Sequence, residues 1–127
     1  MILNYIYFII LLFVIDLIWI SQPIHKSIYS NIQKSPIKIN ITAAVLFYLL
    51  APLGFFIFIR PICNYNIEAL YYGCIMGFLM YMTYDLTNKT IFTNYNWNYV
   101  IYDVTWGTFL YGFVSFIISY LILNKTK

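Results

Sequence analysis

Long apolar runs separated by short polar connections dominate this sequence. Each run approaches or exceeds the roughly 20 residues that a helix needs to cross about 30 Å of hydrocarbon. The runs are continuous, whereas a membrane-spanning strand alternates in polarity over about ten residues, so the pattern predicts helices rather than strands. Four runs satisfy the length criterion: residues 3–20, 39–59, 67–86 and 98–123.

The four runs predict an all-α integral membrane protein, a single domain over residues 1–127 built as an antiparallel four-helix transmembrane bundle. The first run is expected to remain as a membrane anchor, because it lacks the basic segment and cleavage site of a signal peptide. The 21–38 connection alternates in polarity, so a short part of it could lie along the membrane surface. Pro52 is expected to bend the second helix, because it removes one backbone hydrogen bond and frees the Tyr48 carbonyl.

Composition supports the membrane assignment. Hydrophobic residues make up 63% of the chain and charged residues 9%, with a mean hydropathy of +0.80, whereas soluble domains carry about 25% charged residues. The net charge of +3 is scattered, so nucleic acid is excluded as a partner and the lipid bilayer is expected. Cys63 and Cys74 predict neither a disulfide nor a metal site, and no cofactor is expected. The abundance of Ile, Asn, Lys, Tyr and Phe is typical of an AT-rich genome, such as that of a parasite or a large virus.

Three of the four acidic residues are predicted to lie near one membrane face. In an antiparallel bundle, the ends of the first and third runs and the start of the fourth reach the same side. Asp16, Asp85 and Asp103 occupy those places, about one or two helical turns inside the boundary. The fourth acid, Glu68, lies at the opposite face, where an ion pair with Arg60 is expected.

A charged side chain at the bilayer centre costs about 2.5 to 3.5 kcal/mol on insertion scales, so three carboxyl groups indicate a site with a role. No Lys or Arg lies inside the predicted helices to pair with them. Lys89 is the nearest candidate partner for Asp85, while His25 is expected as a surface loop residue, with titration against the cluster as the alternative. The polar site is predicted to comprise Asp16, Trp19, Tyr81, Tyr84, Asp85, Asn88, Asp103 and Trp106.

Small residues on the last two runs predict close helix packing. The spacing of Gly73 and Gly77 matches the Gly-x-x-x-Gly pattern that lets membrane helices approach. The last run has two candidate packing faces, which suit the bundle interior plus either another helix or a second subunit of a homo-oligomer. The predicted packing residues are Gly73, Gly77, Gly107, Thr108, Gly112 and Ser115.

Four fragments resemble, in order and spacing, a family of small membrane proteins known as domain of unknown function 2177 (DUF2177). They are IDLIWI (15–20), AAVLFYLL (43–50), TYDLTN (83–88) and YDVTWGT (102–108). The resemblance covers nearly the whole chain and implies a four-helix integral membrane protein without an established activity. Family members often have Pro after the tryptophan that precedes the last helix, whereas here Asn98 follows Trp97. The family motif positions include Asp16, Trp19, Tyr84, Asp85, Asn88, Asp103, Trp106 and Gly107.

Three functions fit this pattern. The favoured one is transport or binding of a proton, cation or small solute at a carboxylate-lined site near one membrane face. The second is a lipid-modifying enzyme, or its accessory subunit, at headgroup depth, although GxSxG and HExxH motifs are absent. The third is a structural scaffold that oligomerises through the last helix. Each has a structural alternative, since the carboxyl groups could serve only to join helices and the tryptophans could be interfacial anchors.

Overall fold

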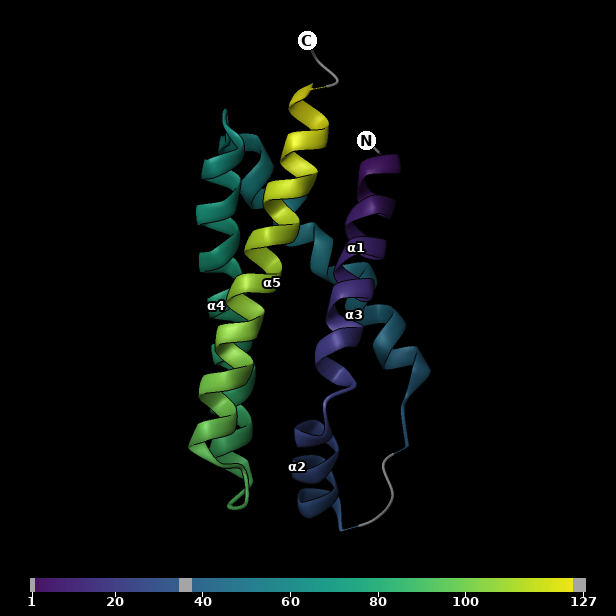
Figure 1. Ribbon diagram of the computed structural model, residues 1–127, viewed down its shortest axis with the longest axis vertical. Helices are drawn as coiled ribbons and strands as arrows, with labels where there is room; N and C mark the ends of the chain where they lie inside the picture. Colours follow the sequence, from purple (N-terminus) through teal and green to yellow (C-terminus); the bar gives the residue numbers. More distant parts are fainter. Residues whose placement is uncertain (1, 35–37, 125–127) are drawn as a thin grey trace.

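The structure is a computed structural model that describes residues 2–34 and 38–124, and every regular element in these ranges is helical (Figure 1). This confirms the all-α prediction. The elements are α1 (Ile2–Ile20), α2 (Pro23–Gln33), α3 (Ile41–Gly54), the π-helix η1 (Phe55–Ile59), the 3₁₀-helix η2 (Arg60–Ile62), α4 (Asn66–Ile91) and α5 (Trp97–Asn124).

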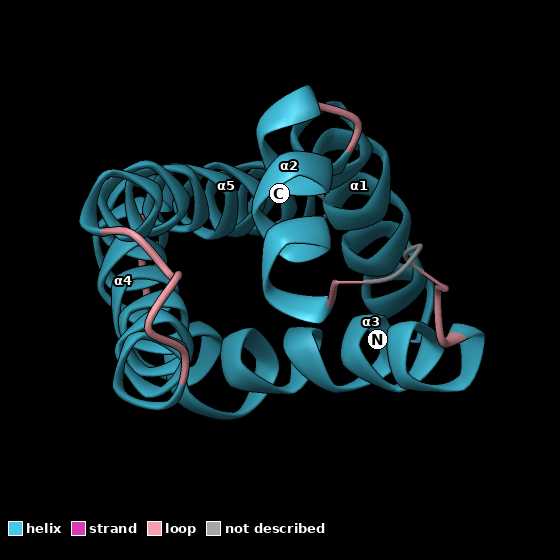
Figure 2. Cartoon of the chain, turned by 90° about the horizontal axis from the view of Figure 1, so that it is seen from below, coloured by secondary structure: helices cyan, strands magenta, loops and turns pink. Residues whose placement is uncertain are grey.

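The long helices alternate in direction, so that α1 begins and α5 ends at the same end of the molecule (Figure 1). Seen along the bundle, α4 and α5 pack side by side, α1 lies against α5, and α3 crosses from α1 towards α4 (Figure 2). The contact between α4 and α5 is the most extensive in the molecule. The short helix α2 continues below α1 (Figure 1).

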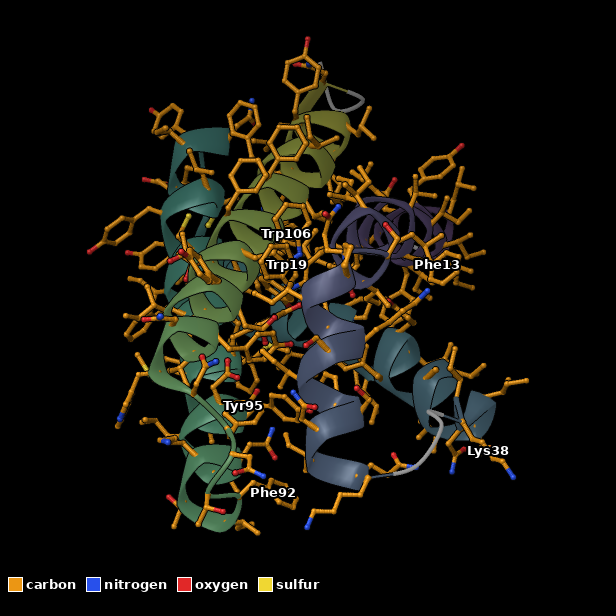
Figure 3. All side chains as sticks on the ribbon, turned by 60° about the horizontal axis from the view of Figure 1, so that its bottom comes forward. Phe13, Trp19, Lys38, Phe92, Tyr95 and Trp106 are labelled. Carbon is orange, nitrogen blue, oxygen red and sulfur yellow. The ribbon has the colours of Figure 1, made fainter. Side chains whose placement is uncertain are left out.

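Three helical segments of the described chain are long and apolar enough to cross a membrane: Ile2–Ile20, Ile41–Ile62 and Trp97–Asn124. The remaining predicted span, residues 67–86, lies within α4. This helix has 26 residues but a lower mean hydropathy, because tyrosines and polar residues interrupt it. Large apolar side chains cover the outer faces of the spans. Phe13, for example, is 42% exposed and points away from the bundle (Figure 3), as expected for a surface in contact with lipid.

Pro52 lies inside the second span, as the sequence predicts. The helix changes to a π-helix three residues later, at Phe55, and the Phe55 amide donates to the Pro52 carbonyl instead of that of Ala51. The Ala51 carbonyl accepts a hydrogen bond from the buried Tyr111 hydroxyl at 2.7 Å. A tyrosine thus restores the hydrogen bonding that a backbone break in a membrane requires.

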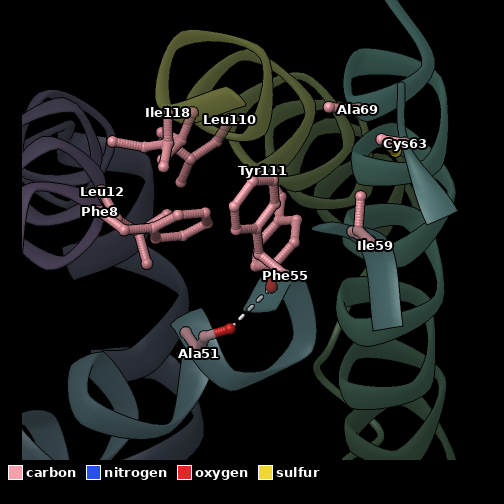
Figure 4. Close-up of a cluster of buried hydrophobic side chains, with 11 residues drawn as sticks. Phe8, Leu12, Ala51, Phe55, Ile59, Cys63, Ala69, Leu110, Tyr111 and Ile118 are labelled. Carbon is pink, nitrogen blue, oxygen red and sulfur yellow. Dashed lines mark hydrogen bonds between the residues drawn. The ribbon is translucent and has the colours of Figure 1, made fainter. Parts of the chain in front are cut away.

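A core of apolar side chains surrounds this break and joins α1, α3, η1 and α5 (Figure 4). Phe8 and Phe55 are fully buried with ring centroids 5.2 Å apart, and Phe8 also contacts Tyr111 at 5.5 Å. Tyr48 and Trp106, which donate to Asp16, pack against this core, so it supports the helices beside the acidic residues.

Glycines let α4 and α5 approach until their backbones touch. A methyl group built on Gly77 would lie 2.4 Å from the Gly107 carbonyl oxygen, and one built on Gly73 would lie 2.7 Å from the Ser115 side chain. Gly112 is similarly close to Cys74. The predicted packing residues on both helices therefore meet one another within a single chain, apart from Thr108, whose hydroxyl donates to the Val104 carbonyl.

One predicted boundary is wrong. The third helix was expected to end at residue 86, but α4 continues to Ile91, and the Thr83, Thr87 and Thr90 hydroxyls donate to carbonyls four residues earlier instead of competing for the backbone amides. The first connection, part of which was expected to lie along the membrane surface, contains α2, which begins at Pro23, a residue suited to the first turn of a helix.

We expect Gly77→Ala to destabilise the protein by about 1–3 kcal/mol, because the added methyl group meets a backbone carbonyl that cannot rotate away. Gly112→Ala is the matched control. Its methyl group meets the Cys74 sulfur, a side-chain atom that can change rotamer, so the loss should be smaller. Thermal unfolding of the purified protein in nanodiscs measures both. Equal stability of the Gly77→Ala variant and the wild type would contradict the close contact.

Candidate functional site

The three carboxyl groups predicted to lie near one face come from α1, α4 and α5 and are all buried. Asp16 and Asp103 are each 5% exposed and Asp85 is fully buried. Asp103 interacts electrostatically with both of the others. The helices therefore bring together three acidic side chains from distant parts of the sequence.

Two tryptophans bind two of the carboxylates across the α1–α5 contact. The Trp19 indole N–H donates to Oδ1 of Asp103 at 2.7 Å, and the Trp106 indole N–H donates to Oδ1 of Asp16 at 3.2 Å. The rings stack on each other with centroids 5.3 Å apart and planes 13° apart (Figure 3). Both helices thus contribute one acid and one indole to a reciprocal arrangement, which a role as interfacial anchors alone does not explain.

Asp16 has a third contact, since the Tyr48 hydroxyl of α3 donates to its Oδ2 at 2.8 Å. Both oxygens of Asp16 are therefore bound, one from α5 and the other from α3. This acid joins three helices, which is the structural role that the sequence leaves open for the cluster.

The partner of Asp85 differs from the predicted one. Lys89 donates to the Tyr95 carbonyl at 2.5 Å and lies 5.7 Å from the centroid of the Trp97 ring. Asp85 Oδ1 instead accepts a hydrogen bond from the Tyr95 hydroxyl. Burial and this bond raise the pKa of Tyr95, so its hydroxyl remains protonated and is the donor.

The second oxygen of Asp85 has no hydrogen bond of normal geometry although it is buried. The Asp103 carboxyl group, another acid, lies close enough to that of Asp85 for a hydrogen bond and an electrostatic interaction. An uncompensated carboxylate is costly in such a setting. A proton or a cation shared by the adjacent pair would remove this cost.

A cavity of about 690 Å³ opens beside Asp16 and Asp103. Its lining comes from α1, α2, α4, α5 and the residue Ile39, and most of it is aromatic or apolar. The residues that carry its polar and aromatic groups are Asp16, Trp19, His25, Lys26, Ser27, Tyr29, Ser30, Tyr81, Tyr99 and Asp103. Among the residues described, no group of three or more His, Cys, Asp or Glu side chains is arranged to hold a metal ion.

His25 is not the surface residue that its position in a connection suggested. It is 9% exposed, because α2 packs on the lower part of α5. Its Nδ1 lies 2.7 Å from the Tyr99 hydroxyl, and its Nε2 has no hydrogen-bond partner. Burial lowers the pKa of His25, so the imidazole is neutral at physiological pH.

The predicted site residues do not all converge. Tyr81 and Trp19 line the cavity, whereas Tyr84 is 50% exposed and bonds the Tyr29 hydroxyl at 3.0 Å on the outer surface. Asn88 lies beside the Tyr95 hydroxyl, and its Nδ2 is buried without a partner of normal geometry.

Glu68, at the opposite end, accepts the backbone amides of Asn64 and Tyr65 and so caps the start of α4. Arg60 donates to the Cys63 carbonyl instead of reaching Glu68.

The site predicted from the sequence did not include four tyrosines that lie at it, and it placed His25 at the surface. Tyr95, Tyr99, Asp103 and Gly107 follow one another at intervals of four residues, which places the last three on one face of α5. That spacing was a usable signal for Tyr95 and Tyr99. In contrast, nothing local distinguishes Tyr48 or Tyr29 from the other tyrosines of a chain that contains 14.

We expect Tyr95→Phe to destabilise the protein by about 1.5–3 kcal/mol, because it removes the hydrogen bond to a fully buried carboxyl group. Tyr84→Phe is the control, since it deletes an exposed hydroxyl with a single tyrosine partner and should cost under about 1 kcal/mol. Thermal unfolding in nanodiscs compares the two. The proposed pairing is refuted if the two variants lose equal stability.

We expect the packing of α2 on α5 to weaken below about pH 6.5, the ordinary pKa of histidine. The folded state lowers the pKa of His25, so folding favours the neutral ring and loses stability as falling pH protonates it. Hydrogen exchange of the α2 amides, corrected for intrinsic rates, should speed up between pH 8 and pH 5. His25→Gln should abolish this dependence, and pH-independent protection in the wild type would contradict it.

Comparison with known proteins places the chain among membrane proteins. The family model described as predicted membrane protein (DUF2177) matches residues 1–121. No curated protein and no solved structure matches. The family match and the three apolar helices together identify a multi-pass membrane protein. The chain belongs to the DUF2177 family of predicted membrane proteins.

Proposed function

We propose that this protein is a four-span membrane protein that takes up and releases a proton or a small cation at the cavity beside Asp16 and Asp103. The observation that carries the proposal is the adjacency of Asp85 and Asp103, two buried acids that face each other. Their contacts come from uncharged tyrosine and tryptophan groups.

The fourth span in this proposal is α4. Its 26 residues correspond to about 39 Å at about 1.5 Å per residue, which is enough to cross the hydrocarbon core. It also packs along α5, a candidate span of similar length. Its glycine contacts with that helix hold the two together in the same layer, and one of its tyrosines, Tyr81, lines the cavity.

Uncharged donors around the acids favour reversible binding over a permanent structural salt bridge. Indole and phenol hydrogen bonds stabilise a carboxylate without neutralising it. The remaining charge attracts a proton or a cation, and the cavity gives it access. When the proton or cation leaves, hydrogen bonds from tryptophan and tyrosine still stabilise the carboxylate oxygens.

Two alternatives have less support from the geometry. The packing residues of α5 on which a scaffold function depended, Gly112 and Ser115, are already in contact with α4. A lipid-modifying enzyme would need an oriented base, yet His25 bonds the Tyr99 hydroxyl and not a carboxylate, unlike the histidine of a catalytic triad.

The proposal predicts that liposomes containing the protein carry protons or monovalent cations faster than protein-free liposomes under an imposed potential. An internal pH dye reports protons, and a potassium electrode reports cation flux. Asp103→Asn and Asp85→Asn should reduce flux to the protein-free level, because each removes one acid of the adjacent pair.

Glu68→Gln is the matched control, since Glu68 caps a helix at the opposite end of the bundle. It should retain wild-type flux. Thermal unfolding and gel filtration establish that each variant is folded. Wild-type flux in a folded Asp103→Asn variant would refute the proposal.

A further inference from the structure

The side chains that line the cavity restrict which kind of cation the cavity can hold. At about 690 Å³ the cavity is far larger than a bare inorganic ion needs and falls in the range of sites for organic ligands, about 300–1,000 Å³. The rings of Trp19, Tyr29, Tyr81 and Tyr99 form much of its wall. Aromatic faces attract organic cations, and they also bury an apolar body.

Two hydrogen-bond acceptors from different helices lie at this lining. Asp103 lines the cavity, where its Oδ1 accepts from the Trp19 indole and its carboxyl group also contacts that of Asp85. His25 is nine-tenths buried, lines the cavity, and has an Nε2 without a partner. In the tautomer whose Nδ1–H donates to the Tyr99 oxygen, Nε2 is an acceptor. In this tautomer, a ligand that supplies an N–H group would satisfy the buried Nε2.

We propose that the cavity binds a protonated primary amine with an apolar body, its ammonium group donating to Asp103 and His25 and its body lying against the aromatic rings. This inference rests on the proposed cation function and names the class of its substrate. The shared chemistry, a primary ammonium on an apolar group, occurs both in free amines and in aminolipid headgroups.

The charges of the lining agree with a single monovalent cation. Asp16 and Asp103 are its acidic groups, Lys26 is its basic group, and burial keeps His25 neutral by lowering its pKa. One more carboxyl than ammonium group therefore faces the cavity. Lys26 is exposed and competes for the same acids, so its removal should strengthen amine binding.

The test uses the full chain in phosphatidylcholine nanodiscs, with binding followed by isothermal titration calorimetry. Benzylammonium is the probe, and three comparison compounds each change one property. Benzyl alcohol lacks the charge, benzyltrimethylammonium lacks the N–H donors, and potassium lacks the apolar body. Benzylammonium should bind saturably and at least about tenfold more tightly than each of the three.

Asp103→Asn should weaken benzylammonium binding at least about tenfold, because it removes a charge-assisted hydrogen bond. Lys26→Gln should strengthen it, and Glu68→Gln should leave it unchanged. Competition by phosphatidylethanolamine added to the nanodiscs would identify an aminolipid as the source of the ammonium group, and unchanged affinity would identify a free amine.

Equal binding of benzyl alcohol, or undiminished binding by a folded Asp103→Asn variant, would overturn the inference. Equal binding of benzyltrimethylammonium would also overturn it, since that cation has no N–H group to donate. Asp103-dependent ion flux in liposomes without benzylammonium binding would overturn the amine inference while leaving the proposed cation function intact. Absence of both would refute the two together.

Discussion

The site depends on the close approach of α4 to α5. Gly77 lies against the Gly107 carbonyl, and a methyl group on Gly107 would overlap the Tyr81 ring. With side chains at these positions the helices would separate, as is usual when packing residues are larger. The glycines precede Asp85 on α4 and follow Asp103 on α5 by one or two turns of helix. The contact therefore determines how closely the two acids face each other.

The other helices complete the acidic cluster with donors that carry no charge. α1 contributes Asp16 and Trp19, α3 contributes Tyr48, and the turn before α5 contributes Tyr95. In a low-dielectric interior these hydrogen bonds are strong, but they leave the acids without a counter-charge. The arrangement fits a site that exchanges a proton or cation better than one whose purpose is to join helices permanently.

Much of the fold could be predicted from the sequence, because apolar run length and glycine spacing are local properties. Three of the four runs lie wholly within helices and the second does so from Ile41 onwards, while Gly73 and Gly77 meet α5 as expected. The end of α4 was misplaced because the polar residues after Asp85 resemble a loop, although they are helical and their Thr hydroxyls donate to backbone carbonyls of the same helix.

The site was less predictable, since its hydrogen bonds join residues far apart in the sequence. The proximity of the three acids followed from their positions along antiparallel helices. Their donors did not, because the choice of Tyr95 over Lys89 depends on how the chain turns between α4 and α5. Likewise, the burial of His25 depends on α2 packing onto α5. Ile24, Ile28 and Ile32 recur at a helical spacing, but that pattern does not specify which helix their face contacts.

A double-mutant cycle on Asp85 and Asp103 tests the central claim most directly. The unfolding free energies of Asp85→Asn, Asp103→Asn and the double variant are measured in nanodiscs against the wild type. Neighbouring groups in one electrostatic network should show a coupling energy of at least about 1 kcal/mol, whereas changes that add within about 0.3–0.5 kcal/mol would mean that the two acids do not interact. Additive effects would contradict the shared site.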